Sequence, residues 1–295
     1  MGEWKTEIRN ELVDVRAEHV ARGHLVHLST SHALVRAAYD ALKVHQRHWA
    51  RAYCAGLAAH SAVITGRASA YLNDMWVANT PLDHVTLVLK SVPPKSQWPD
   101  GVRYIRANLS DRDIVRGEKM STTSPLRTFF DIARHDGFAH ALVAADWLVQ
   151  FGGYNQAQLL ARIESAPRFA GKPVARLAAQ FSSTLSESAP EAYARGLLIA
   201  AGITNVRVNV KVTEWGYRVD LLIDGWLVIE IDGRVKYDNE TYGPAHKALL
   251  DEKTRADRIN NAGYPILRFA PRYLEEHPEK FVASVRDWLA KRARA

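Results

Sequence analysis

Three carboxylates interrupt two apolar runs between residues 217 and 237, in the stretch YRVDLLIDGWLVIEIDGRVKY. Asp220 lies in the first run, and Glu230 and Asp232 lie in the second. The Asp-Gly pair between the runs is typical of the turn in a β-hairpin. Carboxylate oxygens are the ligands that hard divalent cations prefer, and a charge inside a sheet needs a partner of opposite sign. The stretch therefore predicts a hairpin that could hold a metal ion.

The length of the hairpin loop decides where the acids point, because side chains alternate between the two faces of a strand. A two-residue loop would split the acids between the faces and bury one set. A three-residue loop over residues 223–225, with Gly225 in the left-handed conformation, puts Asp220 diagonal to Glu230 on one face. The other face then holds Val219, Leu221, Ile223, Leu227, Ile229 and Ile231, while Leu222 and Val228 share the face of the acids. We therefore expect this loop, with Asp232 also on the acidic face.

Like charges this close repel one another, so the acidic face calls for a divalent cation or a basic residue. Two alternatives need no metal. The acids could lie on a solvated outer face, or they could pair with arginines such as Arg218 or Arg268. Their neighbours are Leu, Val and Trp rather than Lys and Thr, which counts against a solvated face.

A serine-rich stretch that ends in proline, residues 182–190, is typical of a linker and predicts two domains, 1–182 and 183–295. In the second we expect the order αβββαβα, with helices at 191–202, 244–263 and from 279 onward, and strands at 206–212, 218–223, 226–232 and 264–270. The first is expected to be mainly helical with a small sheet. Its expected helices are 3–22, 32–60, 123–137, 138–150 and two short ones within 155–182, and its strands are 84–90 and 102–107. The fold class is α/β of the α+β kind.

The composition narrows the class of protein. A net charge of +7 over 295 residues favours a polyanionic partner, DNA first, although a merely basic cytosolic protein has the same balance. Cys54 is the only cysteine, which excludes a disulfide framework and a thiolate zinc site. No apolar run approaches the roughly 18 residues that span a membrane, and the charged start lacks the apolar core of a signal peptide. We therefore expect a cytoplasmic protein with no membrane partner.

Asp220, followed ten residues later by Glu230-Ile231-Asp232, resembles the PD-(D/E)XK nuclease motif. The wider pattern, from RVDLLIDGWLVIEIDGRVKY to EKTRADRINNAGYPILRF, is similar to nuclease-like domains related to the very-short-patch repair endonucleases. In that family a helix bearing a glutamate precedes the strands, and PEAYARGLL supplies Glu191 here. The resemblance covers residues 185–290 and implies a restriction-endonuclease-like fold.

The resemblance also implies a site for Mg²⁺ or Mn²⁺. Asp220 and Glu230 would be its ligands, with the backbone carbonyl of Ile231 as a third, and Glu191 would reach the metal directly or through water. Mg²⁺ accepts one or two carboxylates and keeps several waters, which suits this number of acids. The bound metal would lower the pKa of a water and orient it for attack on a phosphodiester.

The sequence departs from the family motif at one position, because Asp232 stands where the family has a lysine. Lys253, on the helix after the hairpin, or Lys236 could take the part of that lysine, although Lys253 could equally pair with an acidic neighbour on a solvated helix. Arg218, Lys236 and Arg258 are the expected contacts to DNA.

The first 180 residues resemble abortive-infection antitoxins of toxin–antitoxin systems, in the segments RHWARAYCAGLAAHSAVITGRASAYL and MSTTSPLRTFFDIARHDGFAHALVAADWLV. Antitoxins of that kind often start with a winged helix-turn-helix, and none is evident before residue 50. Three hypotheses follow. The chain is a metal-dependent DNA endonuclease, or a non-catalytic DNA-binding regulator (an antitoxin or phage-type repressor) that retains a nuclease fold, or a defence component that binds a protein partner.

Overall fold

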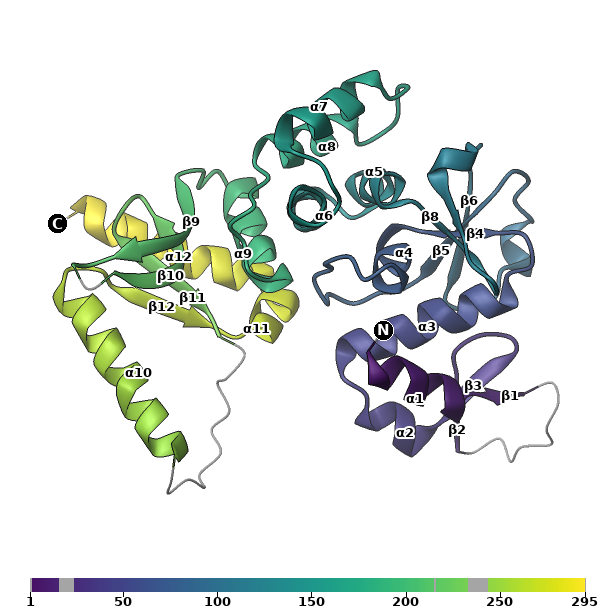
Figure 1. Ribbon diagram of the computed structural model, residues 1–295, viewed down its shortest axis with the longest axis horizontal. Coiled ribbons are helices and arrows are strands. Elements are labelled where there is room, and N and C mark those ends of the chain that lie inside the picture. Colours follow the sequence, from purple (N-terminus) through teal and green to yellow (C-terminus); the bar gives the residue numbers. More distant parts are fainter. Residues whose placement is uncertain (1, 16–23, 215, 233–243, 295) are drawn as a thin grey trace. The chain divides into compact units, whose positions relative to one another are not determined.

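The computed structural model describes residues 2–15, 24–214, 216–232 and 244–294, with the side chains of the last range described from Lys253 to Arg292. These residues form a mixed α+β protein, as predicted (Figure 1). The chain forms two compact units. The N-terminal unit comprises Met1–Gly137 and Pro167–Ala175, and the C-terminal unit comprises Phe138–Ala166 and Arg176–Ala295. Among the described helices, none has the length and apolar character needed to cross a membrane.

The N-terminal unit begins with a helix and a small antiparallel sheet. Helix α1 (Glu3–Glu11) precedes β1 (Val13–Asp14), β2 (Leu25–His27) and β3 (His32–Val35), which lie in the order β1-β3-β2. The helix predicted at 3–22 thus ends at Glu11, and the one predicted at 32–60 is wrong over its first four residues. Ala33 and Leu34 are buried in β3, and Ala33 pairs with Val13, so burial in a sheet overrides local helix propensity.

A second sheet in this unit has five strands. They are β4 (Val63–Thr65), β5 (Val85–Leu89), β6 (Val102–Arg106), β7 (Ile114–Arg116) and β8 (Ser121–Thr123), in the order β6-β5-β4-β8-β7. Two single turns, η1 (Lys95–Gln97) and η2 (Asp111–Asp113), lie in its loops. The strands predicted at 84–90 and 102–107 are confirmed. β4, β7 and β8 were not predicted, because three residues are too few for an alternating pattern to show.

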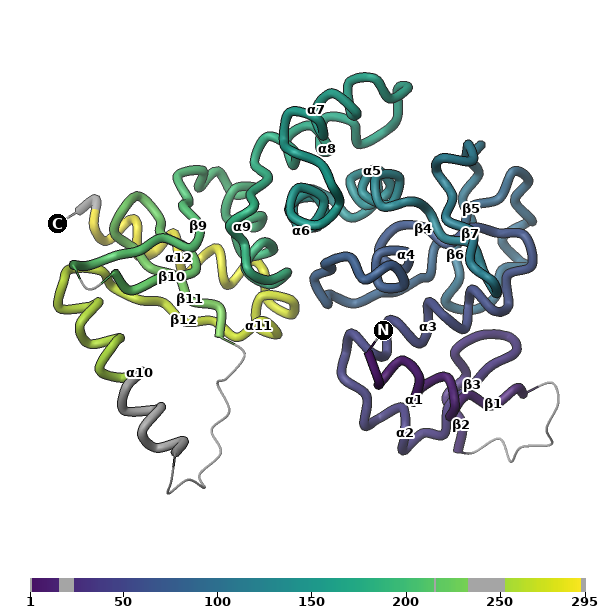
Figure 2. The backbone as a smooth tube through the Cα atoms, viewed as in Figure 1, coloured from purple at the N-terminus to yellow at the C-terminus, as the bar shows by residue number. Residues whose placement is uncertain are grey.

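Helix α3 (Val44–Ala58) lies between the two sheets and supplies both cores (Figure 2). Its Trp49 packs with Ile8 of α1, while Ala52 and Ala55 pack with Ile64 of β4. One helix therefore anchors both layers of the unit. The remaining helices here are α2 (Arg36–Ala41), α4 (Gly66–Leu72) and α5 (Pro125–His135), the last starting at Pro125 directly after its N-cap residue Ser124.

The C-terminal unit starts upstream of the predicted boundary at 182–183. The predicted helices appear as α6 (Phe138–Gln150), α7 (Gln156–Ser165), α8 (Lys172–Gln180) and α9 (Ala189–Ala200). α6 packs along α9 at close range, and a Cβ added to Gly196 would lie 2.7 Å from the Cα of Ala139. This contact joins α6 to the C-terminal unit, although the serine-rich stretch separates the two helices in sequence.

A four-stranded sheet forms the centre of the C-terminal unit. Its strands are β9 (Val206–Val212), β10 (Tyr217–Ile223), β11 (Leu227–Ile231) and β12 (Ile266–Phe269), in the order β12-β11-β10-β9, with only the β11–β12 pair parallel among them. Helix α10 (Pro244–Asn261) lies between β11 and β12 in the chain, and α11 (Pro271–Glu276) and α12 (Pro278–Arg294) follow β12. α9 contacts β9, β10 and β11, and Phe281 of α12 packs on Phe269 of β12. The predicted order αβββαβα is confirmed, with α11 as an addition.

A buried ion pair ties α6 to α9. Both carboxylate oxygens of Asp146 lie 2.7 Å from Nη2 of Arg195, and both side chains are almost wholly buried. The hydroxyl of Ser186 and the backbone N–H of Ser183 also donate to Asp146. Burial raises the pKa of Asp146, against the lowering effect of Arg195 and of these hydrogen bonds. Neither charge can be left alone in this environment at low cost.

Replacing Asp146 with alanine should lower the free energy of unfolding by about 3–5 kcal/mol, because it leaves the guanidinium of Arg195 buried without a counter-charge. Urea denaturation followed by tryptophan fluorescence measures the change. Glu164→Ala is the matched control, since it removes an exposed ion pair with Arg176 and should leave stability nearly unchanged. Similar losses in the two variants would contradict this account of the α6–α9 contact.

Candidate functional site

β10 and β11 form the predicted hairpin, but their pairing is shifted relative to the prediction, so that the loop starts and ends one residue later in the chain. Leu222 pairs with Val228, so the loop is residues 224–226 rather than the predicted 223–225. Both registers put Asp220 and Glu230 on the same face of the sheet. Continued from the observed pairs, the register sets these two acids opposite one another instead of diagonally.

The shift of register arises in the turn. Asp224 and Gly225 both have positive φ, 48° and 76°, and the N–H of Trp226 donates to the carbonyl of Ile223 at 3.0 Å. The sequence analysis assigned the left-handed conformation to Gly225 alone. Asp is one of the few side chains that tolerate this conformation, because its short polar group can bond locally. A second left-handed residue moves the start of the pairing to Leu227.

The acidic face of the hairpin is buried. Leu222 and Val228 lie on it, and they form a core cluster with Ile259 of α10. Glu230 is buried beside them, and Asp220 is half-buried. A solvated outer face is therefore excluded for Glu230. Its charge must be compensated by the protein or by a bound ion.

Two arginines contact the Glu230 carboxylate. Nε of Arg268 on β12 donates to Oε2 at 2.9 Å, and Nη2 of Arg255 on α10 lies 2.8 Å from Oε1. Arg268 was one of the partners considered from the sequence, and its place follows from the parallel pairing of β12 with β11. The contact with Arg255 has ion-pair distance without hydrogen-bond geometry, so the buried Oε1 has no hydrogen-bond donor.

Asp220 has a different environment. Its Oδ2 accepts the backbone N–H of Ile231 at 2.7 Å, and in the described part of the chain no lysine or arginine lies at ion-pair distance from it. Burial raises the pKa of Asp220 to about 6, and the Glu191 and Glu230 carboxylates act in the same direction. The Ile231 N–H and the more distant Arg255 oppose the shift without cancelling it. Asp220 is thus a half-buried carboxyl group with two other carboxylates nearby.

Glu191 lies in the first turn of α9, near enough to Asp220 to raise its pKa. Its own oxygens are engaged locally. Oε1 accepts the Ser188 hydroxyl at 2.7 Å, and Oε2 accepts the backbone N–H of Glu187 at 2.9 Å. The amide of Asn209 on β9 also reaches Oε2, at 3.4 Å. Glu191 therefore caps its helix, in addition to placing a negative charge beside Asp220.

Asp232 stands where the family has a lysine, and Lys253, the predicted substitute for that lysine, lies on a different element. Asp232 directly follows β11, is half-buried, and is held by its backbone N–H to the carbonyl of Phe269. Lys253 is exposed on α10. Arg255, two residues later, points at Glu230. Residues two apart on a helix lie about 200° apart around it, so Lys253 faces away from the acids.

The predicted DNA contacts lie at the start of β10, except for Lys236, which falls outside the described residues. Arg218 is exposed and pairs with Glu187 at 2.6 Å. Arg258 is exposed on α10 and donates to the Tyr217 hydroxyl at 2.9 Å. Arg255 joins this group by donating to the Arg218 carbonyl. Three guanidinium groups therefore surround the end of the strand that carries Asp220.

Arg255 and Asn209 were not predicted as site residues. A signal for Arg255 was present, because Ile259 is the buried apolar residue of the second half of α10 and Arg255 precedes it by one helical turn. Asn209 has positive φ, 47°, inside a strand whose alternation gives no hint of it. Only the fold brings it to Glu191.

A divalent cation is the group that the family resemblance implies here, and the donor set fits one held by two carboxylates. Asp220 and Glu230 share a face, Oε1 of Glu230 is buried without a hydrogen bond, and burial together with two nearby carboxylates raises the pKa of Asp220. Two carboxylates suffice for Mg²⁺, which keeps most of its waters. No group of three or more His, Cys, Asp or Glu side chains in the described ranges could hold a metal, so Glu191 is not a third ligand in this conformation.

Comparison with protein-family models, with curated proteins and with solved structures found no match to this chain.

Asp220 should make folding pH-dependent. Its pKa of about 6 in the folded protein exceeds the usual unfolded value of about 3.9, so its contribution to stability is full below pH 4 and is lost as pH rises to 6. Asp220→Asn keeps an acceptor for the Ile231 N–H and removes the titration. Relative to this variant, the wild type should lose about 1–2 kcal/mol of unfolding free energy between pH 4 and pH 7, allowing for solvent screening.

Urea denaturation across this pH range measures the difference. Asp224→Asn, in the exposed turn of the same hairpin, serves as the control and should track the wild type at every pH. A parallel pH dependence in wild type and Asp220→Asn would show that the carboxyl group has an ordinary pKa.

Proposed function

We propose that this protein is a DNA-directed, metal-dependent endonuclease whose site lies on the β10–β11 hairpin. One observation carries the proposal. The buried Asp131 and Asp146 contact arginines, and so does Glu230, but Asp220 beside Glu230 contacts none in the described part of the chain. Glu191 is buried as well, but hydrogen bonds from Glu187 and Ser188 hold its oxygens. A half-buried acid that lies beside two carboxylates and has no paired cation favours a cation-binding role.

Asp220 and Glu230 would hold the cation, which supplies a bound water of lowered pKa and neutralises charge on a phosphate. Arg255 lies 2.8 Å from Oε1 of Glu230, so it would compete with a cation for that oxygen. Arg268 keeps Oε2 and fixes the orientation of the carboxylate. The surplus acid and these arginines together form a site that attracts a cation and a polyanion to neighbouring positions.

Arg218 and Arg258 would contact the DNA backbone. Both are exposed. Arg218 lies on β10 two residues before Asp220, and Arg258 lies on α10, where it contacts Tyr217 at the start of β10. Arginine presents several N–H groups that match phosphate oxygens, and phosphate contacts position DNA without reading its sequence. The net charge of +7 favours such a partner.

Supercoiled plasmid should be nicked by the wild type in Mg²⁺ or Mn²⁺, and a chelator should stop the reaction. Asp220→Asn and Glu230→Gln should lose on the order of 100-fold in rate, as expected when a group that holds developing charge is removed. Asp224→Asn is the matched control, an acid-to-amide change in the same hairpin away from the acidic face. Cleavage that is equal in all four proteins, or absent with every metal, would contradict the proposal.

A second candidate, a DNA-binding regulator without catalysis, is favoured by a different observation. Arginines contact both oxygens of Glu230, and Lys253 faces away from the acids, so the described conformation brings no lysine to the site. Permanent pairing of this kind would make the acidic cluster a structural element. The basic surface around β10 would then serve binding alone.

If the protein is a DNA-binding regulator without catalysis, it should bind a selected DNA sequence in the presence of a chelator. Arg218→Gln and Arg258→Gln should each weaken binding across sequences and reduce the slope of log affinity against log salt by about 1. Arg176→Gln, which changes another exposed and ion-paired arginine of the same unit, should leave the slope as it is. Fluorescence anisotropy at several salt concentrations measures this, and slopes shared by all variants would count against the assigned surface.

A further inference from the structure

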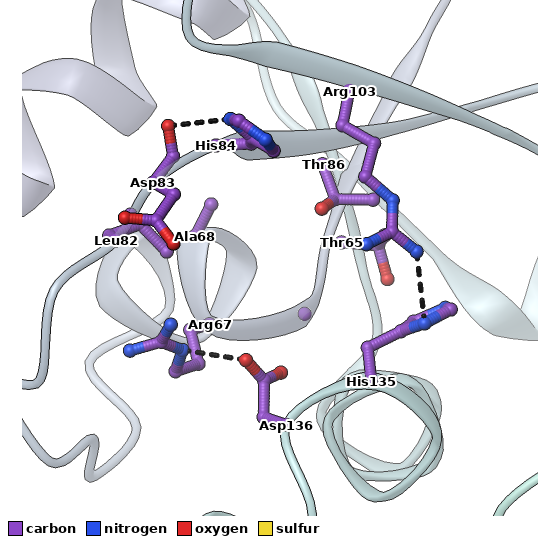
Figure 3. A pocket seen from close by; sticks show the side chains of 11 residues that line it. Thr65, Arg67, Ala68, Leu82, Asp83, His84, Thr86, Arg103, His135 and Asp136 are labelled. Atoms are coloured by element: carbon purple, nitrogen blue, oxygen red, sulfur yellow. Dashed lines mark hydrogen bonds and ion pairs between the residues drawn. The ribbon is translucent and has the colours of Figure 1, made fainter.

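A cavity of about 240 Å³ lies within the N-terminal unit, in a part of the fold that the proposed function does not use. It opens where β4 passes into α4, with Thr65 and Arg67 on that side. The segment from Leu82 to Thr86, Arg103 of β6, and the end of α5 complete its wall (Figure 3). Polar side chains from five elements, β4, α4, β5, β6 and α5, therefore converge on one space.

Arg67 frames the cavity and is fully engaged. Its Nε pairs with Asp136 at 2.8 Å, Nη1 donates to the carbonyl and hydroxyl of Thr80, and Nη2 donates to the carbonyl of Pro81. Arg67 thus fixes the loop before β5 to the end of α5. It also supplies the counter-charge for Asp136, whose pKa burial raises and Arg67 lowers.

Arg103 lies on β6, beside the end of α5. Its Nη2 lies 3.1 Å from Nδ1 of His135, and no acid of the described chain is at ion-pair distance. An arginine has no lone pair to share, so it must be the donor and Nδ1 must be the acceptor. The guanidinium charge faces the cavity with a neutral imidazole as its partner (Figure 3).

The contact with Arg103 also determines which ring nitrogen of His135 carries the proton. With Nδ1 accepting from Arg103, the proton of the neutral ring is on Nε2, which makes Nε2 an N–H donor. Burial lowers the pKa of His135 and the charge of Arg103 adds to the effect, which keeps the ring neutral. Arg103 and His135 therefore offer one cationic fork and one imidazole N–H, and the Thr86 side chain lies beside them.

We propose that this cavity binds a phosphate monoester, with Arg103 as its principal contact and His135 as a second donor. The donors number more than the two oxygens of a carboxylate can use, whereas a phosphate monoester presents three. Of the acids in the wall, Asp136 is compensated by Arg67, and Asp83 is exposed. His84 donates through Nδ1 to the carbonyl of Asp83, which orients its ring over the same space (Figure 3).

Adenosine 5′-monophosphate and inorganic phosphate are the probes, titrated separately into the full chain and followed by the imidazole NMR signals of His84 and His135. Both probes should shift these signals in a saturable way. Arg103→Gln should weaken binding about tenfold or more, the usual effect of losing a charge-assisted hydrogen bond. Arg106→Gln is the matched control, because it lies on the same strand with the opposite parity and does not line the cavity.

Adenosine without phosphate and a blunt DNA duplex lacking terminal phosphates separate the sources of the anion. Shifts caused by the duplex and by neither phosphate probe would assign the cavity to a DNA diester and overturn the proposal. Shifts caused equally by adenosine, or affinities equal in Arg103→Gln and Arg106→Gln, would overturn it too. None of these results depends on the Asp220 site, which is in the other unit and has its own cleavage assay.

Discussion

Burial of the Glu230 carboxylate is the constraint on which the C-terminal unit depends. The residue lies in a central strand of a four-stranded sheet, on a face that also carries the buried Leu222 and Val228. A lone charge there would cost about 3–5 kcal/mol, a large part of the stability of a domain. Arg268 from the neighbouring parallel strand and Arg255 from α10 supply the compensation. One carboxylate therefore links β11, β12 and α10.

Other buried acids of the chain are also paired with arginines, and Asp220 differs from them. Asp131 contacts Arg127 and accepts the Thr65 hydroxyl, and Asp146 contacts Arg195. Among the buried acids, Asp131, Asp146 and Glu230 each contact an arginine of their own unit, whereas Glu191 is held by hydrogen bonds alone. Asp220 has only a backbone N–H, with two other carboxylates nearby, and the cost of that arrangement appears as a raised pKa. Local destabilisation that the surrounding fold tolerates is typical of functional sites.

Much of the fold could be predicted from local pattern. Strands β9 to β12 and helices α5 to α10 follow from alternation, from proline at helix starts and from glycine at helix ends, as at Pro244 and Gly263. The failures are in the N-terminal unit. β3 was assigned to a helix, and β4, β7 and β8 were not assigned at all. Each of these strands has three or four residues, and it exists because partners distant in sequence pair with it, which a local window cannot register.

The sequence by itself determined that Asp220 and Glu230 share a face, because a hairpin closed at Asp224-Gly225 can bury its aliphatic residues in only one parity. Tertiary structure decided what meets those acids. The rotation of α10 about its axis turns Arg255 toward Glu230 and Lys253 toward solvent, and that rotation is set by the packing of Ile259 on the sheet. Spacing along a helix fixes which residues move together, but contact with another element decides which way they face.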